Sequence, residues 1–169
     1  MSETKLMALR EAVNLAMSEE MRKDENIFLM GEDVGIYGGD FGTSVGMLAE
    51  FGEKRVRDTP ISEAAIAGAA VGSAITGLRP IVDLTFMDFI TIALDAIVNN
   101  GAKNNYMFGG GLKTPCNLPC GFWFRDWFCG TARSHLLRSW LTHIPGIKVV
   151  APGNANDAKG LFEICYSRQ

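Results

Sequence analysis

The stretch "KRVRDTPISEAAIAGAAVGSAITG", residues 54–77, decides the fold that the sequence predicts. Its first residues predict a short strand that runs into a turn at Pro60. A helix follows, for which Ser62 is the predicted N-cap and Gly77 the C-terminal stop. A strand that leads through a tight turn into a helix is a unit from which parallel sheets are built, so the stretch predicts an α/β protein.

The sequence on either side continues the alternation of helix and strand. Apolar residues recur at helical spacing over residues 9–21, and "NIFLMGEDVG" (26–35) contains an apolar run of strand length. Further along, the pattern predicts a strand in 78–89, one or two helices in 90–110, and a strand, a loop and a helix start in 144–161. The whole pattern predicts a parallel sheet with helices on both faces.

Composition limits the class of protein. The chain has 169 residues, which predicts a single domain, 1–169. It carries 16 basic and 19 acidic residues without a basic cluster, so neither nucleic acid nor an anionic membrane is an expected partner. The first residues are charged where a signal peptide would be apolar, and the apolar run 64–78 is shorter than a membrane span. We therefore expect a cytoplasmic protein with reduced cysteines.

Glu63 is the first candidate for chemistry. It directly follows the predicted N-cap, at the mouth of a helix beyond a strand end, where open parallel sheets bind ligands. Taken alone, an acid at this position more often only complements the helix dipole. Phe89, taken alone, is more typical of a core position. The glycine-rich loop "YGGDFGTSVG" (37–46) raises the alternative of a flavodoxin-like nucleotide-binding module, although it lacks phosphate-loop spacing.

The helix after Glu63 has an unusual face. Gly68 and Gly72 lie four residues apart with alanines around them. Such small side chains let another backbone approach closely. This is typical of tight helix packing and is compatible with a buried subunit contact.

Several motifs together indicate a family. Over residues 7–115 and again over 140–161, with "GEDV", "DTPISE", "YMFGG" and "HIPGIKVVAP", the sequence resembles the beta subunit of the thiamine-diphosphate-dependent 2-oxo acid dehydrogenases. Pyruvate, branched-chain 2-oxo acid and acetoin dehydrogenases share this subunit. The resemblance implies a transketolase-like pyrimidine-binding domain, and thus an oxidoreductase component.

The resemblance also implies roles for individual residues. Glu63 would hydrogen-bond a ring nitrogen of the cofactor's aminopyrimidine and so activate thiamine diphosphate. Ile61 would line the ring and Phe89 would pack on its face. Glu32 and Asp95 are candidates for a proton relay between paired active sites. In this family the alpha subunit holds the magnesium ion and the diphosphate, so no metal site is expected in this chain.

Partners and reaction follow from the same resemblance. The chain would join alpha subunits and a second beta subunit in a heterotetramer, and would pass acyl groups to the lipoyl groups of an acyltransferase core after oxidative cleavage of the substrate. Likeness around residues 143–160 favours acetoin or pyruvate slightly over branched-chain acids. The alternative is an inactive, truncated fragment with at most an assembly or binding role.

Two segments, 116–139 and 162–169, depart from the family pattern. They contain all four cysteines of the chain: Cys116, Cys120, Cys129 and Cys165. Their spacing does not form the two close pairs typical of zinc sites, and His135 and His143 do not complete one.

Both departing segments can be encoded so that a one-base shift returns family-like peptide. We therefore hypothesise that they are out-of-frame. A family histidine expected near residues 132 and 133 would then be lost, and His135 is not in register with it. We further expect the domain to be truncated at its C-terminal end and to lack the family's second domain.

Overall fold

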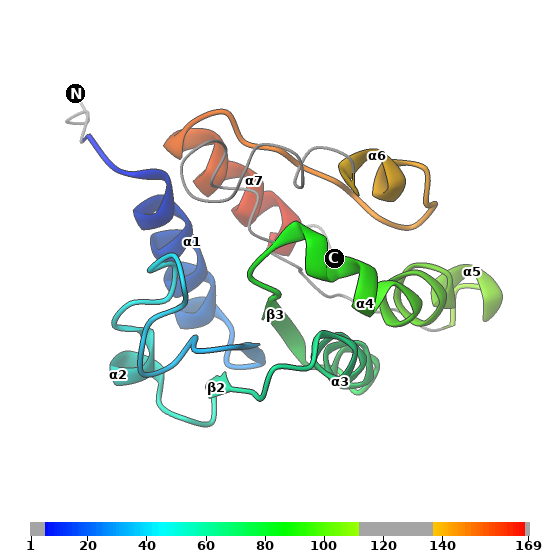
Figure 1. Ribbon diagram of the computed structural model, residues 1–169, viewed down its shortest axis with the longest axis horizontal. Helices are drawn as coiled ribbons and strands as arrows, with labels where there is room; N and C mark the ends of the chain where they lie inside the picture. Colours follow the sequence, from blue (N-terminus) through cyan, green and yellow to red (C-terminus); the bar gives the residue numbers. More distant parts are fainter. Residues whose placement is uncertain (1–5, 112–136, 168–169) are drawn as a thin grey trace.

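A three-stranded parallel sheet organises the structure (Figure 1), a computed structural model that describes residues 6–111 and 137–167. The strands are β1 (Ile27–Gly31), β2 (Val56–Asp58) and β3 (Arg79–Asp83), and their order is β2-β1-β3. Gly31 at the end of β1 pairs in register with Asp58 of β2 and with Asp83 of β3. The carboxyl ends of all three strands are therefore level at one edge of the sheet.

Helices surround this sheet. In chain order they are α1 (Leu9–Lys23), α2 (Met47–Phe51), α3 (Glu63–Ile75), the 3₁₀ turn η1 (Met87–Phe89), α4 (Ile90–Leu94), the π-helix η2 (Asp95–Ala102), α5 (Asn104–Met107), α6 (Leu137–Thr142) and α7 (Ala155–Ser167).

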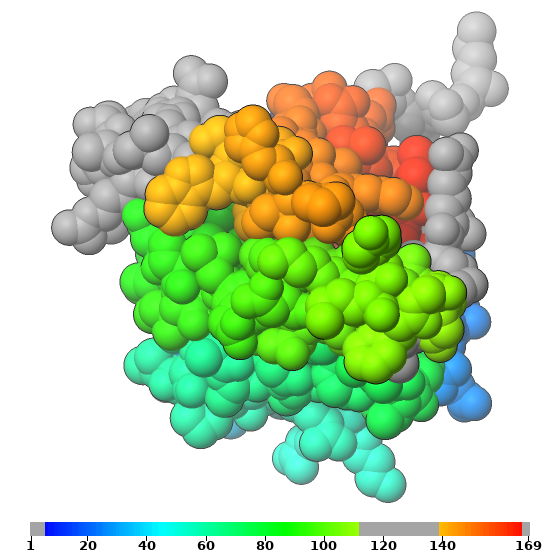
Figure 2. Space-filling model, turned by 90° about the vertical axis from the view of Figure 1, so that its right-hand side faces the viewer, coloured from blue at the N-terminus to red at the C-terminus, as the bar shows by residue number. Residues whose placement is uncertain are grey.

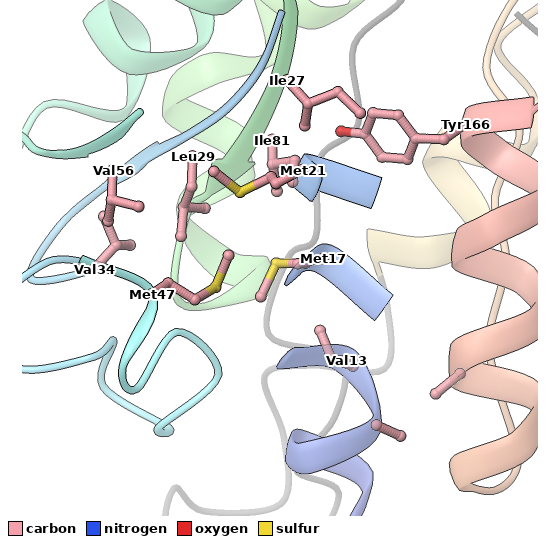
Figure 3. Packing of buried hydrophobic residues seen from close by; sticks show 12 residues of the cluster. Val13, Met17, Met21, Ile27, Leu29, Val34, Met47, Val56, Ile81 and Tyr166 are labelled. Carbon is pink, nitrogen blue, oxygen red and sulfur yellow. The ribbon is translucent and has the colours of Figure 1, made fainter. Parts of the chain in front are cut away.

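One face of the sheet packs against α1 and α7. Ile27 and Leu29 of β1 and Ile81 of β3 point to this side, where they meet Met17 of α1 and Tyr166 of α7 (Figure 3). Successive strand residues point to opposite faces, so the residues between these point to the other side.

The opposite face packs against α3 and the helices after β3. Met30 and Val82 face this side and join a buried cluster with Ile66 of α3 and Ile90 of α4. Figure 2 shows the layers on this side of the molecule, with α3 in blue-green, residues 85–111 in green above it and the segment after residue 139 in orange. Helices on both faces of a parallel sheet confirm the predicted fold class.

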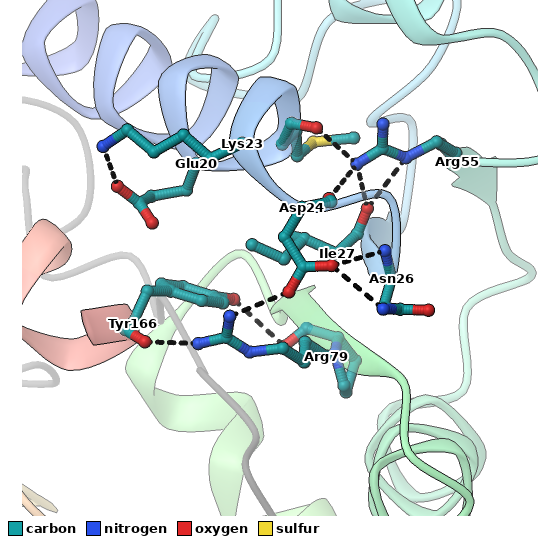
Figure 4. Close-up of polar contacts among 10 residues, drawn as sticks. Glu20, Lys23, Asp24, Asn26, Ile27, Arg55, Arg79 and Tyr166 are labelled. Carbon is teal, nitrogen blue, oxygen red and sulfur yellow. Dashed lines mark hydrogen bonds and ion pairs between the residues drawn. The ribbon is translucent and has the colours of Figure 1, made fainter. Parts of the chain in front are cut away.

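Two arginines close the amino edge of the sheet (Figure 4). Arg55 donates hydrogen bonds to the carbonyl oxygens of Met21, Asp24 and Ile27, at distances of 2.6 to 2.9 Å. Arg79 pairs with the carboxylate of Asp24 at 2.9 Å. These contacts satisfy carbonyls at the end of α1 and fix this helix to the strands.

The helix predicted after Pro60 is confirmed, with one difference in its cap. Ser62 takes the N-cap position, but within the described residues its hydroxyl makes no capping hydrogen bond. Gly77 has φ of +99°, the left-handed conformation that ends a helix with least strain in glycine.

Two strand predictions need correction. The predicted strand in 78–89 ends at Asp83, because the Asp83 side chain accepts the N–H of Thr85 at 2.8 Å and Thr85 turns the chain with φ of 58°. The strand expected after His143 is wrong, since residues 147–150 are assigned to no strand. Ile147 and Val149 nevertheless pack partly against the core. A strand also requires a neighbour in its ladder.

The segment 162–169 lies mostly within α7, which runs through residue 162 to Ser167. Phe162 stacks on Tyr166 with ring centroids 5.1 Å apart, and Tyr166 is 3% exposed. This part of the segment is therefore packed into the core. Cys116, Cys120, Cys129 and His135 lie outside the described residues. No helix in 6–111 or 137–167 is long and apolar enough to cross a membrane.

Candidate functional site

Acidic side chains gather where the strands end. Glu32 directly follows β1, Asp58 ends β2, Asp83 ends β3, and Glu63 begins α3. The level strand ends bring these four elements to one edge, which is the usual ligand-binding position of an open parallel sheet.

Glu63 is enclosed at this edge. Its residue is 6% exposed, and it lies in the first turn of α3, which begins with the hydrogen bond from the N–H of Ile66 to the carbonyl of Ser62 at 2.9 Å. The predicted catalytic acid is thus buried within this chain and does not extend into solvent. A buried carboxyl at a helix N-terminus is well placed to bind a polar group of a ligand.

Glu32 is electrostatically coupled to Glu63. Burial raises the pKa of the Glu32 carboxyl above its ordinary value, and the negative charge of Glu63 is the second cause. Asp40, Asp33 and Asp83 raise this pKa further. Glu32 therefore keeps its proton to a higher pH than an isolated glutamate, and the charge of Glu63 contributes to this.

Asp95, the other predicted relay residue, lies elsewhere. It begins η2, is exposed, and accepts hydrogen bonds from the side chains of Asn99 at 2.7 Å and Asn100 at 3.3 Å. The charges that act on Glu32 come from Glu63 and from acids at the sheet edge. The structure therefore brings Glu32 and Glu63 together and leaves Asp95 on its own helix.

The two predicted apolar contact residues both face outward. Ile61 is 81% exposed and Phe89 is 38% exposed. Phe89 continues an edge-to-face row of rings, in which the centroids of Phe41 and Phe86 are 5.4 Å apart and those of Phe86 and Phe89 are 5.5 Å apart. An aromatic row at the ligand edge offers a surface on which a planar ring can pack.

Thr59 is a site residue that the sequence reasoning missed. Its N–H donates to the carbonyl of Gly31 at 2.9 Å, but its buried hydroxyl oxygen has no hydrogen-bond partner among the described residues. A buried hydroxyl without a partner is costly, so this edge has unused hydrogen-bonding capacity. Its position within "DTPISE" was the available signal.

Asp83 was also missed, because a polar residue inside an apolar run looked like an ordinary strand position. Burial raises the pKa of its carboxyl, while the hydrogen bonds from Thr85 and Thr43 lower it by less. No group of three or more His, Cys, Asp or Glu side chains suited to a metal ion occurs within residues 6–111 and 137–167.

Comparison with known proteins agrees with this geometry. The sequence pattern of the family described as "Transketolase, pyrimidine binding domain" matches residues 5–169. The chain is 45% identical over 164 residues to "Pyruvate dehydrogenase E1 component subunit beta" of Rhizobium meliloti. It is 44% identical over 172 residues to "Acetoin:2,6-dichlorophenolindophenol oxidoreductase subunit beta" of Bacillus subtilis, and 42% identical over 161 residues to the mitochondrial pyruvate dehydrogenase E1 beta subunit of Homo sapiens.

These matches cover most of this chain and part of each relative. The match with the Rhizobium meliloti protein covers 96% of this chain and 35% of that relative. The match with the Bacillus subtilis protein covers 94% and 49%, and the match with the human protein covers 93% and 44%. A solved structure described as "Split gene transketolase, inactive beta4 tetramer" matches with a TM-score of 0.70 over 98% of this chain and 50% of that one. At 19% sequence identity this likeness shows the fold alone. Because the family pattern extends over residues 5–169, the chain belongs to the transketolase pyrimidine-binding domain family.

Proposed function

We propose that the chain is the pyrimidine-binding part of a beta subunit of a thiamine-diphosphate-dependent 2-oxo acid or acetoin dehydrogenase. The observation that carries this proposal is the buried carboxyl of Glu63 at the carboxyl edge of the sheet, beside a second carboxyl whose pKa is raised. The named relatives support the same reaction class, since they are beta subunits of pyruvate dehydrogenase and of an acetoin oxidoreductase.

The residues present fit the aminopyrimidine of this cofactor. Glu63 would hydrogen-bond a pyrimidine ring nitrogen, Ile61 would line the ring and Phe89 would pack on its face. The buried hydroxyl of Thr59, for which residues 6–111 and 137–167 offer no hydrogen-bond partner, supports binding of a polar ring at the same edge. When bound, thiamine diphosphate supplies a nucleophilic carbon and an electron sink for cleavage next to a substrate carbonyl.

Proton sharing would fall to the carboxyl pair. Glu32, which holds its proton more tightly than a free glutamate, would act as a proton relay residue beside Glu63. Asp95 would continue a relay toward a second active site across a subunit contact. The exposed face of α3, where Gly68 and Gly72 have no described atom within 4 Å of an added Cβ, supports such a contact.

Other chains would complete the site. An alpha subunit would hold the magnesium ion and the diphosphate, and a second beta subunit would complete a heterotetramer in the cytoplasm. A lipoyl acyltransferase core would accept the acyl group after oxidative cleavage. Acetoin or pyruvate is the substrate we favour.

The test is cofactor binding by the chain in complex with alpha subunits of the pyruvate or acetoin dehydrogenase type. The wild-type complex should bind thiamine diphosphate, and Glu63→Gln should weaken binding about tenfold or more, the cost of one hydrogen bond to a charged group. Glu53→Gln is the matched control, because it makes the same change from carboxylate to amide at an exposed turn. Binding that is equal in all three complexes would refute the role of Glu63. Association with alpha subunits without any cofactor binding would favour the alternative, an inactive fragment with an assembly role.

A further inference from the structure

The loop that follows Glu32 is a compact unit held over the sheet edge. Within it, the N–H of Gly39 donates to the carbonyl of Asp33 at 2.8 Å and that of Ser44 donates to the carbonyl of Gly38 at 2.9 Å. The Ser44 hydroxyl closes its base with a hydrogen bond to the carbonyl of Val34 at 2.7 Å. These hydrogen bonds connect residues 33–34, 38–39 and 44 within the loop, which begins directly after Glu32.

This loop also shapes the environment of Glu32. Two of the charges that raise the pKa of Glu32, those of Asp33 and Asp40, belong to the loop. Glu63 of α3 and Asp83 of β3 are the other charged groups that act on it, and burial is the largest cause. Displacing the loop would change the distance of Asp33 and Asp40 from Glu32, so the pKa of Glu32 reports the position of the loop.

Asp58 connects the loop to the end of β2. Its carboxylate accepts the N–H of Gly35 at 2.6 Å and the N–H of Ile36 at 3.4 Å. The contact is tight, since a Cβ added at Gly35 would lie 2.6 Å from a carboxylate oxygen of Asp58. A side chain at position 35 would therefore force the Asp58 carboxylate to move from its place at these amides.

We propose that Asp58 is a positioning residue, which holds the loop 33–46 by two of its amides and thereby fixes Glu32 beside Glu63. A carboxylate provides two acceptor oxygens for two N–H groups, which an amide side chain cannot match. The catalytic relevance of this contact rests on the proposed function, whereas the contact and its effect on Glu32 do not.

The experiment uses the full chain without cofactor and combines Asp58→Asn with Gly35→Ala. Hydrogen exchange of the Gly35 and Ile36 amides should become about tenfold faster in Asp58→Asn, because a charge-assisted hydrogen bond is lost. NMR titration of the Glu32 carboxyl should show its pKa falling toward the ordinary value in both single variants. Gly35→Ala keeps the charge of Asp58, so a fall in this variant comes from loop displacement and not from the lost charge.

The double variant and a distant control complete the test. Asp58→Asn combined with Gly35→Ala should lower the pKa of Glu32 no further than either change alone, since both break one contact. Asp24→Asn removes a paired carboxylate from the opposite edge of the sheet and should leave the pKa of Glu32 unchanged.

Two results would overturn the proposal. One is unchanged exchange at Gly35 and Ile36 in Asp58→Asn. The other is a Glu32 pKa that stays raised in Gly35→Ala, which can be read even if Asp58→Asn fails to fold. Neither result depends on cofactor binding, so the proposal and the proposed function can fail separately.

Discussion

The guanidinium of Arg79 lies over the ring of Tyr166, 5.0 Å from its centroid, and also donates a hydrogen bond to the carbonyl of Tyr166. The Tyr166 hydroxyl donates in turn to the carbonyl of Pro80 at 3.3 Å. The last turns of α7 are therefore bound to the first residues of β3, although the two elements are far apart in sequence.

Replacing Tyr166 tests this contact. Tyr166→Ala should lower the free energy of unfolding by about 3 kcal/mol, because it leaves a cavity in a buried aromatic site. Tyr166→Phe keeps the ring and removes only the hydroxyl, so it should cost about 1 kcal/mol. Urea unfolding of the two variants measures both. Equal and negligible losses would show that the segment after residue 162 does not belong to the core.

The coupling of the two site carboxyls gives a second prediction. Glu63→Gln removes the charge that contributes most to the raised pKa of Glu32, so this pKa should fall. The burial of Glu32 should still keep it above the ordinary value. NMR titration of the glutamate carboxyls measures this shift. Glu53→Gln is the control and should not move it. An unchanged pKa in Glu63→Gln would mean that the two side chains are not neighbours.

The pH dependence of stability should report the ion pair of Asp24. The hydrogen bond from Arg79 is the largest cause that lowers the pKa of Asp24 below 3.8. A depressed pKa in the folded state stabilises the fold above the unfolded-state pKa, and this contribution is lost as the pH falls through the folded-state value. For this partly exposed pair the contribution should be about 1 kcal/mol.

Asp24→Asn is the variant that isolates this contribution. Its stability should change less than that of the wild type when urea unfolding is compared at pH 5 and at roughly pH 2 to 3. Equal acid destabilisation in both proteins would contradict the assignment to Asp24.

The exposed glycines of α3 give a fourth prediction. Gly68→Ala should stabilise the separate chain by about 0.5–1 kcal/mol, because a helix interior favours alanine and no described atom lies within 4 Å of the added Cβ. Gly77→Ala should be destabilising, since Gly77 has φ of +99°. Thermal unfolding measures both. If another subunit packs on this face, Gly68→Leu should block assembly while the chain stays folded.

The departing segments give a fifth prediction. Nucleotide sequencing of the gene should reveal a frame change at the borders of 116–139 and 162–169. Within each segment, the frame shifted by one base should encode family-like peptide. Codons that remain in one frame throughout would refute the hypothesis. Tyr166 would then be a core residue of the correctly read domain.

Local patterns predicted the elements near the site well. Helix α3 and its end at Gly77 follow from an apolar pattern bounded by a turn and a glycine, which are properties of neighbouring residues. Glu63 could be placed at the sheet edge for the same reason. The resemblance added its role, which position alone did not give.

Contacts between distant residues were not predictable in this way. Asp58 accepts hydrogen bonds from amides 22 and 23 residues away. Arg55 donates to three carbonyls at the end of α1 and the start of β1. The failed strand at 147–150 has the same origin, because its ladder partner is a matter of tertiary structure. The sequence pattern determines which face is buried, whereas the partner depends on how the chain is folded.

The sheet separates two kinds of residue onto opposite rims. At the amino rim, Arg55 hydrogen-bonds the carbonyl of Ile27 and Arg79 pairs with the carboxylate of Asp24. Glu32, Glu63 and Thr59 lie at the carboxyl rim. Substitutions of the acidic residues at the carboxyl rim should therefore leave the hydrogen bonds of Arg55 and Arg79 at the amino rim in place.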